Sequence, residues 1–279
     1  MLKTYYDERE TRTPESRETG LMAALPRILH HAKTKSAGYG RVLADIDPQA
    51  ITSREALATL PVTRKSDLID AQSKEQPLAG LNGTPIPAMA RMFQSPGPIY
   101  DPQGKGDDWW RMGRAFFAAG FRPGDIVHNC LSYHLTPGGF IFDSGARACG
   151  CVVVPAGVGQ SEAQVKAISD LKPAGYSGTP SFLKILIEKA EELGADISSI
   201  KRALVSGEAL PESLRDWFAE RDIAMLQCYA SADLGLIAYE SDAKDGMIVA
   251  EDIILEIVRP GTGEPVEAGE VGEVVVTTL

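Results

Sequence analysis

Short apolar segments alternate with helix-like segments between residues 109 and 228, and this alternation constrains the fold more than any other feature. The segments between the apolar runs carry apolar residues at helical spacing. The pattern predicts strands at 125–131, 151–154, 174–177, 200–205 and 224–228, separated by helices at 109–119, 140–149, 161–171, 180–193 and 212–219. This order is typical of an α/β fold with a mostly parallel sheet flanked by helices.

Helix-start signals support several of these elements. Ser161 and Gln164 form a capping-box pattern, in which two side chains satisfy backbone N–H groups of the first turn. Thr179 precedes Pro180, which predicts an N-cap followed by the first helical residue. The apolar face of the helix that follows is expected to contain Phe182, Leu186, Ala190 and Leu193.

The two ends of the chain follow other patterns. The first part is predicted to be helical and irregular, with Pro26 as a candidate helix start, an N-cap at 52–53, and a loop rich in Pro and Gly at 83–106. Beyond residue 236, short strands and Gly turns predict an antiparallel subdomain. The expected domains are an N-terminal helical or irregular region (1–90), an α/β core (91–235) and a truncated β-rich subdomain (236–279).

The distribution of charge and of apolar residues excludes some partners. The chain has 28 Lys and Arg against 38 Asp and Glu, a net charge of −10. Residues 240–279 hold ten of the acids against Lys244 and Arg259, and are predicted to be solvated strand edges, with a metal or partner contact as the alternative. Nucleic acid is bound mainly by basic residues, so it is not an expected partner. No apolar run approaches the roughly 18 residues of a membrane span, so a membrane is not expected either.

The cysteines and the first residues predict the compartment. Cys130, Cys149, Cys151 and Cys228 lie in apolar runs without a CxxC pair, and the first 20 residues are charged throughout. These features favour a reduced, cytoplasmic protein.

Common nucleotide and nucleophile motifs are absent from the sequence. There is no GxxxxGK[ST], GxSxG, HExxH or GxGxxG, which argues against a P-loop NTPase, an α/β-hydrolase and a dinucleotide dehydrogenase. Ligands of doubly wound sheets lie beyond the carboxyl ends of the strands. The segments at 132–139, 206–210 and 229–233 are therefore the candidate site.

Each candidate side chain has a chemical and a structural interpretation. The Gly138-Gly139 pair at a helix start either offers N–H groups to a carboxylate or phosphate, or permits close packing. Tyr229 either stacks on a base or lies in the core. Asp233 either holds Mg²⁺ beside phosphates or caps a helix. His134 is a general base, a substrate contact or a structural residue.

In order along the chain, several motifs resemble those of the phenylacetate–coenzyme A ligase family of adenylate-forming enzymes. Each motif is weak alone, whereas their order is specific. The resemblance is carried by Leu60–Leu68, His134–Gly139, Gly159–Gln164, Thr179–Phe182, Ser206–Glu208, Tyr229–Gly235, Glu251-Asp252 and Gly269–Leu279. It implies the N-terminal domain fold of such enzymes, with residues 91–235 as the nucleotide- and acid-binding core.

The resemblance implies an ATP-dependent acyl-CoA ligase, an acid–thiol ligase. Such an enzyme converts a carboxylic acid and ATP·Mg²⁺ to an acyl-adenylate and pyrophosphate, and then transfers the acyl group to coenzyme A. The implied partners are a small carboxylic acid, ATP and coenzyme A, and members of the family commonly form homodimers.

The resemblance also assigns residues to roles. His134 and Asp233 would be catalytic, with Asp233 holding Mg²⁺. The nucleotide would be bound by Ser206, Gly207, Glu208, Ala209, Gln227, Cys228, Tyr229, Ala230 and Ser231. The acid pocket would be shaped by Tyr133, His134, Thr136, Gly138 and Gly139. The polar side chains of Tyr133, His134 and Thr136 favour a small or hydroxylated acid.

Three features depart from the family pattern. Residues 94–104 replace a phosphate loop rich in Ser, Thr and Gly, and Pro96, Pro98 and Pro102 remove N–H donors. Ala232 and Asp233 replace a hydroxyl residue and a Glu. The chain stops before the family's ribose-binding Asp, its hinge and its C-terminal lid domain with the catalytic Lys.

Three functions follow as alternatives. The leading one is the N-terminal part of an acyl-CoA ligase with impaired activity by itself. The second is a catalytically degenerate, ligase-like binding module for a nucleotide or acyl ligand. The third is an unrelated α/β transferase that binds a phosphorylated metabolite near Gly138-Gly139.

Overall fold

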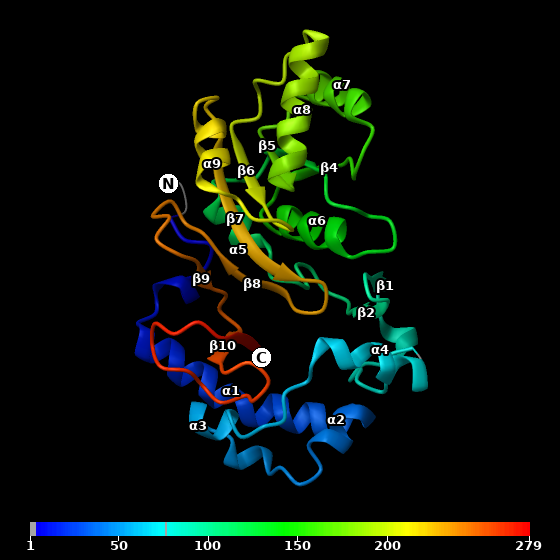
Figure 1. Ribbon diagram of the computed structural model, residues 1–279, viewed down its shortest axis with the longest axis vertical. Coiled ribbons are helices and arrows are strands. Elements are labelled where there is room, and N and C mark those ends of the chain that lie inside the picture. The colour runs from blue at the N-terminus through cyan, green and yellow to red at the C-terminus, as the bar shows by residue number, and fades with distance from the viewer. Residues whose placement is uncertain (1–3, 76) are drawn as a thin grey trace. The chain divides into compact units, whose positions relative to one another are not determined.

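The computed structural model describes residues 4–75 and 77–279 (Figure 1). The chain forms two compact units. The first combines the described residues up to Tyr6 with Gly106–Ala250, and the second combines Asp7–Lys105 with Glu251–Leu279. These units group the residues differently from the three consecutive segments expected from the sequence, because the first and last segments share one unit.

A seven-stranded sheet with the order β4-β3-β5-β6-β7-β8-β9 forms the first unit. Five of its strands are parallel: β3 (Ile126–Asn129), β4 (Val152–Pro155), β5 (Gly175–Gly178), β6 (Arg202–Val205) and β7 (Ala224–Ser231). β8 (Gly235–Tyr239) and β9 (Ile248–Val249) add an antiparallel edge. The prediction of a mostly parallel sheet flanked by helices is confirmed.

The helices of the first unit follow the predicted order. They are α5 (Gly113–Ala118), α6 (Gly138–Ala148), α7 (Ser161–Leu171), α8 (Pro180–Leu193) and α9 (Glu212–Ala219). α5 begins four residues later than predicted, because Asp108 and Arg111 have positive φ values of 50° and 64° that a helix does not allow. Among the described residues, no helix is long and apolar enough to cross a membrane.

The helix-start predictions for α7 and α8 have different outcomes. At α8, the Thr179 hydroxyl accepts a hydrogen bond from the Phe182 N–H (3.4 Å), as predicted. At α7, the predicted capping box is wrong, because the N-cap residue is Gln160 in a left-handed conformation and the Gln164 side chain bonds elsewhere. The buried face of α8 also differs: Leu193 is 49% exposed, and the buried positions are Leu183, Leu186, Ile187 and Ala190.

The second unit contains helices and two small antiparallel sheets. Its helices are α1 (Pro14–Lys35), α2 (Ala37–Val42), α3 (Arg54–Leu57) and α4 (Lys65–Lys74). A 3₁₀ turn precedes α1 (Glu8–Thr11), another lies between α2 and α3 (Pro48–Ala50), and a third follows α4 (Ile86–Ala88). β1 (Arg91–Ser95) pairs with β2 (Ile99–Gln103), and β10 (Ile253–Val258) pairs with β11 (Glu273–Thr278). The apolar core joins Leu21, Leu25 and Leu29 of α1 to Ile254 of β10.

The sequence predictions for this unit are partly wrong. Pro26 lies inside α1 and does not start a helix. The predicted loop at 83–106 contains the β1–β2 hairpin, because Phe93 and Ile99 alternate with polar residues and bury one face. Ser53 does cap α3, since its hydroxyl accepts a hydrogen bond from the Ala56 N–H (3.2 Å).

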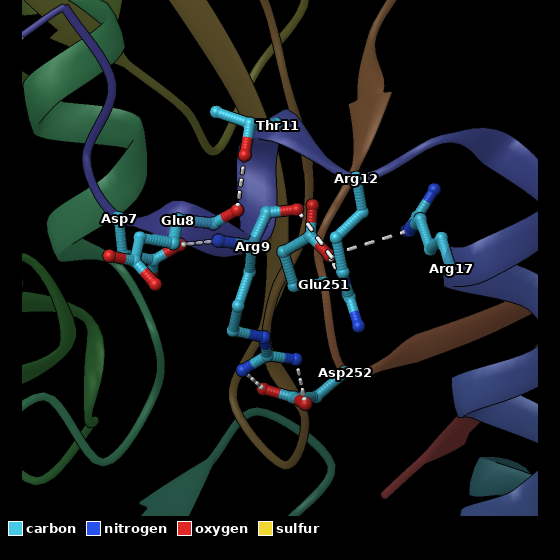
Figure 2. Close-up of polar contacts among 8 residues, drawn as sticks. All are labelled: Asp7, Glu8, Arg9, Thr11, Arg12, Arg17, Glu251 and Asp252. Atoms are coloured by element: carbon cyan, nitrogen blue, oxygen red, sulfur yellow. Dashed lines mark hydrogen bonds and ion pairs between the residues drawn. The ribbon is translucent and has the colours of Figure 1, made fainter.

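Arginines of the N-terminal segment bind the acids that precede β10 (Figure 2). Arg9 forms a bidentate pair with Asp252, with Nη1 2.9 Å from Oδ2. The buried Glu251 carboxylate binds Arg12, and its Oε2 lies 3.7 Å from Arg17 Nε. The acid-rich region is therefore not solvated throughout, because Glu251 and Asp252 also bind the arginines at 9–17 within this unit.

Candidate functional site

The carboxyl ends of the parallel strands bring the predicted residues to one edge of the sheet. The 132–139 segment follows β3, residues 206–210 follow β6, and residues 229–233 lie at the end of β7. β6 and β7 are direct neighbours, and the Ser206 hydroxyl donates to the Cys228 carbonyl (2.9 Å). Two of the three candidate segments are thus linked by a hydrogen bond.

Residues 207–209 offer mainly backbone to a ligand. Gly207 has a φ of 85° and is exposed, as are Glu208 and Ala209. The Glu208 carboxylate accepts a hydrogen bond from the Ser181 N–H (2.6 Å) in the first turn of α8. Glu208 therefore caps α8. A negative side chain at a helix N-terminus stabilises the helix.

The end of β7 exposes one aromatic ring. Tyr229 is 47% exposed, so the interpretation of this residue as a core side chain is wrong. The neighbouring Cys228 is buried, and burial raises the pKa of its thiol to about 12. The thiol of Cys228 is therefore not exposed to a ligand beside the Tyr229 ring.

A buried ion pair holds Gln227 in place. Glu240 on the segment after β8 accepts from the Gln227 N–H and from Gln227 Nε2, both at 2.9 Å. Arg215 of α9 binds the same carboxylate with distances of 2.8 and 3.1 Å. The Gln227 side chain is thus turned toward Glu240. Sequence reasoning missed Arg215 and Glu240, since they lie 25 residues apart in segments without a motif.

The turn after β7 presents the Asp233 carboxylate at the surface. Ser231 donates from its hydroxyl to Asp233 Oδ1 (2.7 Å), and the same hydroxyl accepts from the Leu234 N–H (3.3 Å). Within the described residues, no cluster of three His, Cys, Asp or Glu side chains is placed to hold a metal. A single carboxylate fits Mg²⁺ only when phosphate oxygens and water complete the shell, which is the usual arrangement for Mg²⁺–nucleotide sites.

Residues 108–112 contact the turn that follows β7 and hold it in place. The Trp110 carbonyl accepts from the Leu236 N–H (3.0 Å), and Arg111 donates to the Leu234 carbonyl. Gly235 has a φ of 73°, and a Cβ there would lie 2.7 Å from the Trp110 carbonyl oxygen. Glycine is therefore required at this position. The sequence gives no signal for this contact beyond the Gly itself.

Asp108 begins this supporting segment and makes the stability of the chain depend on pH. Burial raises the pKa of Asp108 to about 6, although its carboxylate accepts from the Gly113 N–H (2.9 Å). Within the described part of the chain, its buried Oδ1 has no hydrogen-bond partner. Protonation therefore favours the folded state: the stabilisation is fully present below pH ~4 and is lost as the pH rises through about 6.

We predict that Asp108→Asn raises the free energy of unfolding at pH 8 by about 1–3 kcal/mol. Asn keeps the acceptor for Gly113, removes the buried charge and tolerates the φ of 50° at this position. Urea unfolding of both proteins at pH 4.5 and pH 8 measures the effect, which we expect to shrink at the lower pH. An equal effect at both values contradicts the assignment, and Asp107→Asn, at an exposed neighbour, is the control.

The segment after β3 is anchored by hydrogen bonds within itself. The Gly139 N–H donates to the Ser132 carbonyl (2.7 Å), and the Thr136 hydroxyl lies 3.4 Å from the same oxygen. The Gly139 N–H is therefore not offered to an anion, which removes support from phosphate binding at Gly138-Gly139. His134 is exposed at the tip of this segment.

The Tyr133 hydroxyl also forms hydrogen bonds within the protein. It lies 2.7 Å from Asn129 Nδ2, which donates to it, and 3.2 Å from Asp143 Oδ2, to which it donates. Burial raises the pKa of Tyr133, so the hydroxyl stays protonated. The Tyr133 hydroxyl is therefore bonded within the protein. A polar acid pocket, which was inferred from His134 and Thr136 as well, stays a prediction.

Gln164 ties the loop after β4 to β3 and was missed as a site-supporting residue. Its Nε2 donates to the carbonyls of Gly157 (3.0 Å) and Gly159 (2.7 Å). Its Oε1 lies 2.9 Å from His128 Nε2, which therefore carries the proton. Burial lowers the pKa of His128, which keeps the imidazole neutral.

Residues 94–104 form a hairpin in the second unit. The register pairs Ser95 with Ile99 and Met92 with Pro102. Gln72 of α4 holds the hairpin, since its side chain donates to the Tyr100 carbonyl (2.9 Å) and accepts from the Tyr100 N–H (2.8 Å). The backbone of this segment is therefore partly used by strand pairing.

Comparison with known proteins identifies the family. Residues 109–278 match the family model described as AMP-binding enzyme. The chain belongs to this family. The matched range contains every candidate nucleotide- and acid-binding residue predicted from the sequence.

Curated relatives of the chain are phenylacetate-coenzyme A ligases. The one from Thermus thermophilus is 31% identical over 99% of this chain and 64% of its own length. The ligase from Pseudomonas putida is 31% identical over 98% of this chain and 65% of its own length. The chain thus spans about two thirds of these relatives, and the resemblance inferred from the sequence is confirmed.

Solved structures confirm the fold. A 2-hydroxyisobutyryl-CoA ligase in an open conformation, in complex with 2-HIB-AMP and CoA, superposes with a TM-score of 0.91 at 24% identity. The match covers 99% of this chain and 64% of that chain. The same ligase in the thioesterification state gives a TM-score of 0.87 at 25% identity, over 97% and 61% of the two chains.

Proposed function

We propose that the chain binds the adenylate and acid of an ATP-dependent acyl-CoA ligase reaction. In this reaction a carboxylic acid and ATP give an acyl-adenylate, and the acyl group then passes to coenzyme A. The observation that carries the proposal is the juxtaposition at neighbouring strands β6 and β7: exposed backbone at 207–209, the exposed Tyr229 ring, and Asp233 on the following turn. The curated relatives, which are named phenylacetate-coenzyme A ligases, support it.

The proposed roles follow from the side chains that face solvent. Tyr229 stacks on the adenine, whose edge meets the backbone at Gly207 and Ala209. Asp233 is the carboxylate that would hold Mg²⁺ beside the phosphates, and a bound Mg²⁺ would supply neutralisation of their charge. His134 and the Tyr133 ring contact the acid. Holding the carboxylate in line with the α-phosphorus is the main catalytic contribution of such a site.

Calorimetry on the 279-residue chain tests the nucleotide site. We expect wild-type protein to bind AMP, and to bind ATP more tightly with Mg²⁺ than with EDTA. Tyr229→Ala removes a base-stacking contact worth about 1–3 kcal/mol, which weakens AMP binding roughly 5- to 150-fold. Asp233→Ala should abolish the Mg²⁺-dependent gain and leave AMP binding intact.

The matched control for the carboxylate is Asp170→Ala. Asp170 is an exposed acid paired with Lys166 on α7, outside the candidate site. The Asp170→Ala variant should bind AMP and ATP like the wild type. Failure of the wild-type chain to bind AMP contradicts the proposal, and so does an Mg²⁺-dependent gain that survives in Asp233→Ala.

A further inference from the structure

Asn129 lies at the carboxyl end of β3 with its side chain buried and fully bonded. It is 1% exposed. Its Nδ2 donates to the Tyr133 hydroxyl (2.7 Å) and to the Gly139 carbonyl (2.9 Å). Its Oδ1 accepts from the Ser177 hydroxyl (3.0 Å), and the Leu131 N–H lies 3.4 Å away. One buried amide therefore joins strand β5, the segment after β3 and the first turn of α6.

The Tyr133 ring is confined on several sides. A Cβ at Gly139 would lie 2.6 Å from Tyr133 Cγ, so the ring rests directly on the Gly139 backbone. The Phe140 ring meets it edge-on, with centroids 5.1 Å apart and an interplanar angle of 79°. A Cβ at Gly157 would lie 4.0 Å from Tyr133 Cδ2. Packing limits the orientation of the Tyr133 ring. The hydrogen bonds of its hydroxyl with Asn129 and Asp143 fix how far the side chain extends into the protein.

We infer that Asn129 is a positioning residue that sets the position of the Tyr133 ring, and thereby the size of acyl group that the site accepts. This inference rests on the proposed function, because it takes the segment after β3 as the wall of the acid pocket. The hydroxyl of Tyr133 is bonded into the protein, so the surface left for an acyl group is the apolar ring. The buried Asn129 contacts the Tyr133 hydroxyl and does not itself touch the acid.

The chemistry of the amide explains why this position suits Asn. Its two N–H groups satisfy the Tyr133 oxygen and the Gly139 carbonyl, while its oxygen accepts from Ser177. An Asp at 129 would place a carboxylate oxygen against the Gly139 carbonyl, and a Leu would remove the amide from Tyr133, Gly139 and Ser177 alike. Either change releases Tyr133 and alters the space beside it.

The test is a binding series on the full chain with AMP and with stable acyl-adenylate analogues, the N-acylsulfamoyl adenosines with acetyl, 2-hydroxyisobutyryl and phenylacetyl groups. Asn129→Ala and Tyr133→Phe should each change the ratio of dissociation constants between small and large acyl groups, by about tenfold or more. AMP affinity should stay within about twofold of wild type. Because both variants remove the hydrogen bond between Asn129 and Tyr133, their effects on the ratio should not add in the double variant.

Matched variants separate positioning from general loss of structure. Ser177→Ala removes one partner of Asn129 and should change the ratio in the same direction by a smaller factor, which carries the test if Asn129→Ala does not fold. Ser144→Ala removes a hydroxyl that bonds within α6 and should change nothing. An unchanged acyl ratio in Ser177→Ala and Tyr133→Phe, with AMP binding intact, overturns the inference. Absence of AMP binding by wild type instead overturns the proposed function, and the inference with it.

Discussion

Arg215→Met is expected to lower the free energy of unfolding by about 3–5 kcal/mol, because it leaves the buried Glu240 carboxylate without its cation. Glu240 is 7% exposed, so water replaces the guanidinium poorly. The same carboxylate accepts from the backbone and side chain of Gln227. Its displacement should therefore also disturb the end of β7 and weaken AMP binding.

Urea unfolding and AMP calorimetry measure the two effects on Arg215→Met. Adding Glu240→Gln removes the uncompensated charge while keeping an acceptor for Gln227, so the double variant should recover much of the lost stability. Arg221→Met on an exposed face is the control, since Arg221 stacks on Trp217 at the surface. A double variant no more stable than Arg215→Met would show that the carboxylate charge is not the cause.

Gly145→Ala is expected to destabilise the first unit by about 3 kcal/mol or more, because α6 touches the start of α5 through bare backbone. A Cβ at this position would overlap Met112 Cβ and lie 2.7 Å from the Met112 carbonyl carbon and 3.0 Å from the Gly113 nitrogen. Met112 is fully buried, so its backbone has no room to move. The helices would have to separate.

A second glycine in the same helix provides the comparison for Gly145→Ala. A Cβ at Gly138 would meet no atom closer than 3.8 Å, so Gly138→Ala should change unfolding free energy by about 0.5 kcal/mol or less. Thermal and urea unfolding of the two variants give the difference directly. Similar stabilities for both would mean that α5 and α6 do not pack through Gly145.

The alternation of strands and helices was predictable because most parallel strands of the first unit are short buried runs and helices such as α6 and α8 bury one apolar face. β3 to β7 and α6 to α9 lie within a few residues of their predicted ranges. The hairpin at Arg91–Gln103 was not predictable in the same way, since Pro98 and Pro102 suggested a loop and only the burial of Phe93 and Ile99 decides the outcome.

The site residues that directly follow strands were predictable from the sequence. The buried polar side chains that hold them in place were not. Tyr229 and Asp233 were found because the carboxyl ends of parallel strands hold ligands. Asn129, Gln164 and Glu240 were missed, since a polar residue within an apolar run gives no sign of its hydrogen-bond partners. The Tyr133 hydroxyl was misjudged for the same reason, because its partner Asp143 lies ten residues away on α6.

The division of the chain into two units bears on where it can be cut. The family match begins at residue 109, yet Tyr6 packs edge-on against Phe117 with centroids 6.0 Å apart and lies under the Arg114 guanidinium. Ile254 of β10 completes a core whose other members come from α1 and its neighbours. A fragment that starts at the edge of the family match would expose both apolar surfaces. The evolutionary boundary of this domain is therefore not its folding boundary, and expression or domain exchange should keep the N-terminal residues attached.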